Sequence, residues 1–241
     1  MPVLLLRLAG PMQSWGTQSR FTNRDTGREP SKSGVIGLLC AALGVPRDDE
    51  AALVPLAALR MGVRVDREGR VARDYHTAGG GRLPGGRDYG VIKASGAKGD
   101  PVVSDRYYLA DAEFLVGLEG TDADLLSRCH CALAAPRWPL FLGRKAFTPG
   151  LPVHLPDGLR EESLDAALRA YPWRPRREGE TPEAPLRLLL ETDDITREAR
   201  MDRPLSFALG VRRYALRYVE ETLISADEVV IGGPVPCLSP D

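Results

Sequence analysis

An almost unbroken apolar run near the N-terminus, PVLLLRLA at residues 2–9, constrains the fold most strongly. A run this short, and apolar at nearly every position, is typical of a buried strand. The next apolar segment, residues 31–46, predicts a helix that Ser31 or Ser33 can cap and that Gly44 can end. This segment is apolar almost all round, so we expect the helix to be buried against a sheet.

Further strand and helix patterns follow. Residues 57–77 predict a hairpin, because apolar and polar residues alternate on both sides of the turn sequence DREG. Residues 106–120 and 138–145 predict strands, and residues 121–136 predict a second helix capped by Thr121. Two helices in a split strand–helix–strand order fit a ferredoxin-like fold, which is also the fold of the RNA-recognition motif. We therefore predict an α+β protein with a modified ferredoxin-like domain.

A glycine-rich segment, residues 78–105, interrupts this domain. A loop of this length inside a compact domain is typically functional or disordered. After about residue 150 the pattern changes to a short helix, an exposed Pro/Glu/Arg-rich loop and further strands. We expect a first domain at 1–153, with an insertion at about 78–105, and a small C-terminal β-rich subdomain at 154–241.

Charge is distributed unevenly, although the net charge is only −1. Residues 7–32 carry five Lys or Arg against two acids, whereas residues 219–241 carry five acids and no Lys or Arg. Segregated charge favours oriented binding surfaces. Only four of the 32 cations are lysines, and arginine suits phosphate and base contacts. An arginine-rich chain is equally typical of a GC-rich genome.

Several protein classes are disfavoured. The four cysteines do not form the pattern of a secreted disulfide scaffold. The sequence CHC at 129–131 lacks a second ligand pair and lies in a predicted helix, so we expect no metal, no cofactor and a structural or surface role for His130. No signal peptide and no apolar run of membrane length is visible. We expect a soluble, cytoplasmic protein.

Catalytic motifs are also missing around the three histidines. The histidine to consider is His76, which follows Tyr75 at the end of a predicted strand and at the start of the glycine-rich segment. A histidine there could act as a general base on an RNA ribose hydroxyl, bind a phosphate, or have no role.

Residues suited to single-stranded RNA recur in four segments. Such RNA is held by cations that face phosphates and by planar groups on which bases stack. Helix N-termini and glycine turns add backbone N–H groups that attract anions. The alternatives are a core position for Trp15 and a solvated turn for Arg144 and Lys145. The candidates are Trp15, Arg20, Arg24, Ser31, Lys32, Ser33, Arg106, Tyr107, Gly143, Arg144 and Lys145.

Four stretches together resemble the type I-E branch of the Cas5 family of CRISPR-associated proteins. They are LLLRLAGPMQSWG near the N-terminus, PSKSGVIGLLCAALG at the predicted helix, YYLADAEFLVGLEG in the middle and PLFLGRKAFTPGLPV near residues 140–153. The similarity covers most of residues 1–153 and returns at DRPLSF, residues 202–207.

The resemblance implies a subunit of the Cascade surveillance complex that holds the 5′ handle of the CRISPR RNA. It implies a thumb inserted in the sheet, matching residues 78–105, which contacts the backbone subunit, and a further contact with the large subunit. Target DNA would be contacted only indirectly. By the same match, the residues expected at the handle are Gln13, Ser14, Trp15, Gly16, Ser31, Lys32, Ser33, Arg144 and Lys145.

Another branch of the family cleaves the precursor RNA with a tyrosine, a lysine and a histidine. Here Tyr75 and His76 form the nearest approximation, and no lysine adjoins them. We therefore predict a non-catalytic RNA-binding subunit. The alternatives are a metal-independent endoribonuclease that uses His76 and a scaffold whose basic loops contact protein acids.

Overall fold

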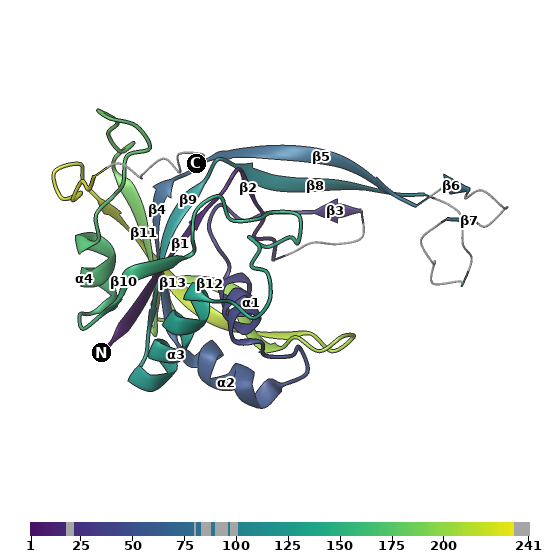
Figure 1. The fold of residues 1–241 in the computed structure, drawn as a ribbon, viewed down its shortest axis with the longest axis horizontal. Coiled ribbons are helices and arrows are strands. Elements are labelled where there is room, and N and C mark those ends of the chain that lie inside the picture. The colour runs from purple at the N-terminus through teal and green to yellow at the C-terminus, as the bar shows by residue number, and fades with distance from the viewer. Residues whose placement is uncertain (18–21, 80, 83–87, 90–95, 97–100, 234–241) are drawn as a thin grey trace.

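The computed structural model describes residues 1–17, 22–79, 81–82, 88–89, 96 and 101–233. A large antiparallel sheet forms the centre of the molecule, with helices on both faces and a long two-stranded arm projecting from one end (Figure 1). The sheet has seven strands in the order β10 (His154–Arg160), β1 (Val3–Ala9), β9 (Glu113–Glu119), β4 (Arg60–Arg67), β11 (Leu186–Thr192), β13 (Arg213–Ile224) and β12 (Glu198–Ser206). The mixed α+β prediction is confirmed.

The N-terminal strand β1 is buried at all seven positions, as its sequence predicts. Because successive side chains of a strand point to opposite faces, β1 contributes to two cores. Leu4, Leu6 and Leu8 pack in the larger core, whereas Val3 and Leu5 pack in the smaller one. The continuous apolar run therefore reflects a strand covered on both faces.

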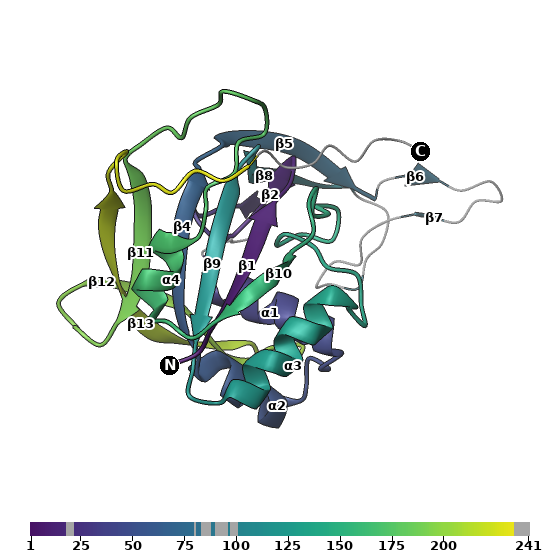
Figure 2. The ribbon, with the colours of Figure 1, turned by 60° about the vertical axis from the view of Figure 1, so that its left-hand side comes forward.

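Three helices cover one face of the sheet and one covers the other (Figure 2). The first group is α1 (Lys32–Leu43), α2 (Glu50–Ala58) and α3 (Ala123–Ala134), and the opposite face carries α4 (Leu164–Ala170). The side chain of Ser31 caps α1, and Gly44 ends it in the left-handed region, both as predicted. The cap of α3 is Asp122 and not Thr121 as expected.

The hairpin predicted at 57–77 is wrong in two respects. Its first residues belong to α2, and β4 does not pair with the next strand, β5 (Arg70–Ala78). Both edges of β4 are occupied, by β9 and β11, so β5 leaves the main sheet and pairs with β8 (Val102–Ala110). These two strands form the arm seen in Figure 1.

The arm is part of a second sheet. Strand β8 also pairs with β2 (Met12–Gln13) and β3 (Asn23–Arg24), which attach the arm to the loop after β1. Two short strands, β6 (Gly81–Arg82) and β7 (Asp88–Tyr89), pair with each other. The segment 78–105 thus contains the end of β5, β6, β7 and the start of β8, and much of it lies outside the described residues.

Two further strand predictions need correction. Residues 106–120 form the end of β8 and then β9, because Asp111 adopts a left-handed conformation (φ 63°) and turns the chain between them. Residues 138–145 form an irregular turn, in which Leu142 pairs with Phe147 and accepts a hydrogen bond from the backbone N–H of Ser14. This turn therefore holds the loop after β1.

The C-terminal strands join the same sheet as the N-terminal ones. Strand β10 pairs with β1, and β11 pairs with β4. The boundary between 1–153 and 154–241 stays a prediction, but hydrogen bonds within one sheet cross it. In the described part of the chain, no helix is long and apolar enough to cross a membrane.

Candidate nucleic-acid interface

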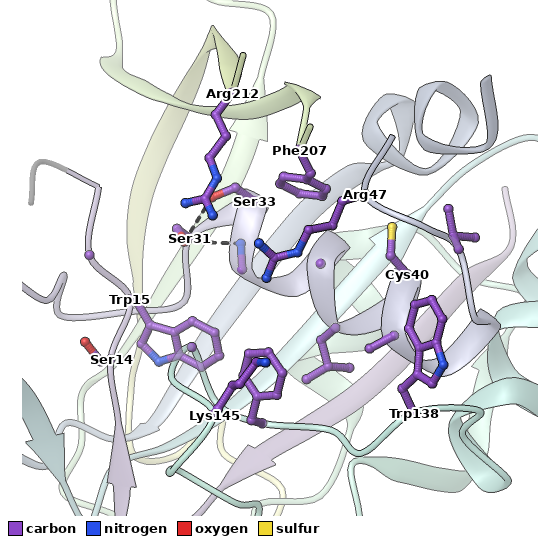
Figure 3. A pocket seen from close by; sticks show the side chains of 18 of the residues that line it. Ser14, Trp15, Ser31, Ser33, Cys40, Arg47, Trp138, Lys145, Phe207 and Arg212 are labelled. Atoms are coloured by element: carbon purple, nitrogen blue, oxygen red, sulfur yellow. Dashed lines mark hydrogen bonds between the residues drawn. The ribbon is translucent and has the colours of Figure 1, made fainter. Parts of the chain in front are cut away.

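A groove of about 630 Å³ runs along α1 (Figure 3). Its walls come from the loop after β1, from α1, from the turn at 138–145 and from the connection between β12 and β13. These segments are far apart in the sequence and meet only in the fold. Seven residues predicted from the sequence line the groove: Ser14, Trp15, Gly16, Ser31, Ser33, Gly143 and Lys145.

Three cationic side chains also line the groove. They are Arg47, just after α1, Lys145 in the turn and Arg212 before β13, and all three are exposed. Among the residues that the structure describes, no ion pair or hydrogen bond engages the side chain of any of the three. Figure 3 shows Arg47 and Arg212 on one side and Lys145 on another. The groove therefore presents uncompensated positive charge.

Aromatic rings make up much of the remaining lining. Trp138 is 43% exposed and Tyr214 is 37% exposed, and Phe207 is half-buried. None of these three rings is among the candidates predicted from the sequence. Exposed rings beside unpaired cations are the combination that binds single-stranded nucleic acid, since bases stack on rings and phosphates face cations.

The first turn of α1 forms one edge of the groove. Ser31 accepts a hydrogen bond from the backbone N–H of Gly34 (3.3 Å), and its hydroxyl lies 3.4 Å from that of Ser33. The positive end of a helix dipole favours anions at this position. Since the backbone N–H of Lys32 donates to Asp202 and that of Gly34 to Ser31, Ser33 is the residue of the first turn placed to meet an anion in the groove.

Gln13 and Trp15 serve mainly to build the groove wall. The amide of Gln13 is fully buried and donates to the carbonyls of Leu8 (3.1 Å) and Ala112 (2.8 Å), while its oxygen accepts from the indole N–H of Trp15 (3.1 Å). Only 1% of Trp15 is exposed. Trp15 therefore occupies the core position that was the alternative to RNA binding. Neither the amide of Gln13 nor the indole N–H of Trp15 is free to bind RNA.

Lys32 requires a correction. Its side chain is 1% exposed, and Nζ donates to both oxygens of Glu191 (2.8 and 2.9 Å). Its backbone N–H donates to Asp202 (2.8 Å), which is itself held by Arg217. Burial lowers the pKa of Lys32, and Glu191 opposes this effect. A buried and paired ammonium has no surface for phosphate, so Lys32 instead fixes the start of α1.

Four other predicted residues lie outside the groove lining. Arg144 donates to the backbone carbonyls of Tyr107 (2.9 Å) and Arg24 (3.2 Å), and Arg106 donates to Ser104 (3.0 Å). Burial and the nearby charges of Arg106 and Arg24 lower the pKa of Arg144. These arginines form a second basic cluster, in which Arg144 connects the turn to the base of the arm. Arg20 lies outside the described residues.

The alternative catalytic residues lie on the arm. Tyr75 is exposed and His76 is half-buried, and as neighbours on β5 they point to opposite faces of the ribbon. The Nδ1 atom of His76 lies 3.4 Å from Asp74. Neither residue lines the groove. The described residues contain no group of three or more His, Cys, Asp or Glu that could hold a metal ion.

A family model described as CRISPR-associated protein (Cas_Cas5) matches residues 3–220. The chain belongs to the CRISPR-associated Cas5 family. The matched range includes every groove residue named above, from Ser14 to Tyr214. The family resemblance predicted from the sequence is confirmed.

Individual relatives agree with this membership. The Cascade subunit CasD of Escherichia coli (strain K12) is 39% identical over 154 residues, which cover 59% of this chain and 65% of that relative, slightly under two thirds of its length. A solved structure described as the crystal structure of a Cas protein is 42% identical with a TM-score of 0.73, covering 95% of this chain and 98% of that one. A chain from a CRISPR RNA-guided surveillance complex is 41% identical with a TM-score of 0.71, covering 96% and 94%.

Proposed function

We propose that this protein is an RNA-binding subunit of a type I-E Cascade surveillance complex and that its groove holds part of the 5′ handle of the CRISPR RNA. The observation that carries this proposal is the convergence of three unpaired cations, Arg47, Lys145 and Arg212, on one groove with exposed aromatic rings. Similarity to CasD and to a chain of an RNA-guided surveillance complex supports the same assignment.

The chemistry of the groove suits an unpaired strand better than a duplex. Phosphates would lie against the guanidinium groups, the ammonium group and the first turn of α1. Bases would stack on Trp138 or Tyr214, which have exposed ring surface. Because every base has a planar face, this arrangement supplies affinity. The half-buried hydroxyl group of Ser33 would read base edges or ribose, whereas the Ser14 hydroxyl is buried and donates to the carbonyl of Tyr107 (3.2 Å).

The role we propose is non-catalytic. A general base for RNA cleavage must reach the ribose hydroxyl, and His76 lies on the arm, outside the groove. No lysine is hydrogen-bonded to His76 or Tyr75 among the described residues. We therefore place precursor processing in another protein.

We also propose that the fold is ferredoxin-like and that the arm is the thumb expected at 78–105. The strand order β10–β1–β9–β4, with α1 after β1 and α3 after β9, supports the first part. The position of β5 to β8 between β4 and β9 supports the second. The arm would contact the backbone subunit, the body would contact the large subunit, and target DNA would be reached only through these partners.

The salt dependence of RNA binding tests the groove. Labelled repeat RNA is titrated in EDTA against the wild type and the Lys145→Ala/Arg212→Ala double variant at several salt concentrations. Each lost phosphate contact should reduce the slope of log K against log salt by about 0.7 for a single strand, so the double variant should lose roughly 1.4. Arg128→Ala, on the exposed surface of α3, is the matched control and should keep the wild-type slope.

A slope that stays unchanged in the double variant would contradict the assignment of the groove. The same tubes, analysed on a denaturing gel, test the alternative. A discrete product that disappears in His76→Ala would favour the endoribonuclease. Binding without a salt-dependent component would favour the scaffold.

A further inference from the structure

Two histidines meet between α3 and β10. His130 lies on α3 and His154 begins β10, and Figure 2 shows these two elements side by side. Their Nε2 atoms are 3.0 Å apart, and the ring centroids are 4.4 Å apart. The carbonyl oxygen of Leu155 lies 3.0 Å from the Nε2 atom of His130. The Nε2 atom of His130 thus has a second imidazole nitrogen and a carbonyl oxygen at 3.0 Å.

The separation of the two nitrogens suits a shared metal ion. Imidazole nitrogens bind first-row metals at about 2.0–2.1 Å, so two nitrogens 3.0 Å apart subtend an angle of roughly 95° at the ion. This angle corresponds to adjacent positions of square-planar or octahedral coordination, which Cu²⁺ and Ni²⁺ prefer, and is narrower than the tetrahedral angle of a structural zinc site. Imidazole is also a favoured ligand type for these ions.

The surroundings allow an ion to enter. A shallow cavity of about 440 Å³ beside His154 opens between the end of α3 and residues 149–154. Both rings are only half-buried, so water can fill the remaining coordination positions.

We propose that His130 and His154 form a two-histidine site for a divalent transition-metal ion. The ion would join α3 to β10 across 24 residues of sequence. Neither histidine lines the RNA groove, so this proposal is independent of the proposed function. Since the described residues offer no third side-chain ligand of the usual types nearby, and binding costs His130 its hydrogen bond to Leu155, the site should be weaker than a structural zinc site.

The test is a calorimetric titration of tag-free protein with Ni²⁺ at about pH 7.5, where unperturbed histidine is neutral. The wild type should bind one Ni²⁺ per chain. His130→Gln and His154→Gln should each weaken binding by roughly tenfold or more. His76→Gln removes the third histidine of the chain and should bind as the wild type does. Cys131→Ser, next to His130 and exposed, should also leave binding unchanged.

Thermal unfolding gives a second readout. Because a ligand that binds only the folded state stabilises it, Ni²⁺ should raise the Tm of the wild type and of His76→Gln but not of His154→Gln. Circular dichroism of the metal-free variants checks that each one folds. No Ni²⁺ binding up to about 1 mM, or equal binding by His154→Gln and the wild type, would overturn the proposal. His130 and His154 would then form only a hydrogen bond with each other.

Discussion

Replacing Trp15 by phenylalanine tests whether this tryptophan builds the groove or reads RNA. The change removes the N–H that the buried oxygen of Gln13 accepts. An unsatisfied buried acceptor costs about 1–3 kcal/mol, and the smaller ring leaves a void against Gly34, which the indole ring contacts closely. A void of this kind adds roughly 1–2 kcal/mol. We expect the free energy of unfolding to fall by about 2–5 kcal/mol.

The assay is urea unfolding followed by far-ultraviolet circular dichroism, with RNA affinity measured on the same samples. The matched control is Trp138→Ala, because Trp138 lines the same groove but is 43% exposed. This control should change the free energy of unfolding by less than about 0.5 kcal/mol. It should weaken RNA binding by about 1–3 kcal/mol if a base stacks on the ring. A Trp15→Phe variant with wild-type stability and impaired RNA binding would refute the reasoning.

Three further predictions concern the supports of the groove. Lys32→Met leaves the carboxylate of Glu191, which is 13% exposed, without its ammonium partner and should lower the free energy of unfolding in urea by about 3 kcal/mol. Burial alone would raise the pKa of Asp202, but Arg217 and the N–H of Lys32 outweigh it and lower the pKa. The contribution of Asp202 to the free energy of unfolding is therefore fully present above the pKa that Asp202 has in the unfolded chain, and it is lost as the pH falls through its pKa in the folded protein. Asp202→Asn should thus flatten the pH dependence of the free energy of unfolding below about pH 4. Gly143→Ala should displace the turn and reduce RNA affinity in a titration of labelled RNA, because Gly143 has a φ of 86° and an added Cβ would overlap the carbonyl of Ser14. Gly37→Ala, at a helical position where the nearest atom to an added Cβ lies at 3.9 Å, should instead gain stability.

The parts of the fold that depend on local pattern could be predicted from the sequence. Strand β1 and helix α1 carry their own signals, an unbroken apolar run and a serine cap with a terminal glycine. Local pattern does not predict helix α2, because Pro55 lies inside it, although Asp49 is its cap. Strand β5 was paired wrongly because only the sheet order reveals that both edges of β4 are occupied.

Some residues of the candidate site could likewise be predicted from local sequence pattern, and others could not. Ser31, Ser33 and Lys145 could be found because each lies in a short motif with a helix start or a turn. Arg47 and Arg212 carry no local signal and are brought together only by the packing of the β12–β13 connection beside α1. Lys32 follows Ser31 in the same motif. Its side chain is nevertheless buried, because its ammonium group pairs with Glu191, a residue far along the chain.

The most direct test of the central claim is photo-crosslinking of the 5′ handle to this protein within the assembled complex. CRISPR RNA carrying a photoreactive base at successive handle positions is loaded, irradiated and mapped by mass spectrometry of the crosslinked peptides. Crosslinks in the peptides that carry Trp138, Lys145 and Tyr214 are the predicted result, because these residues line the groove. Handle crosslinks confined to the β5–β8 arm, or to other subunits alone, would contradict the account.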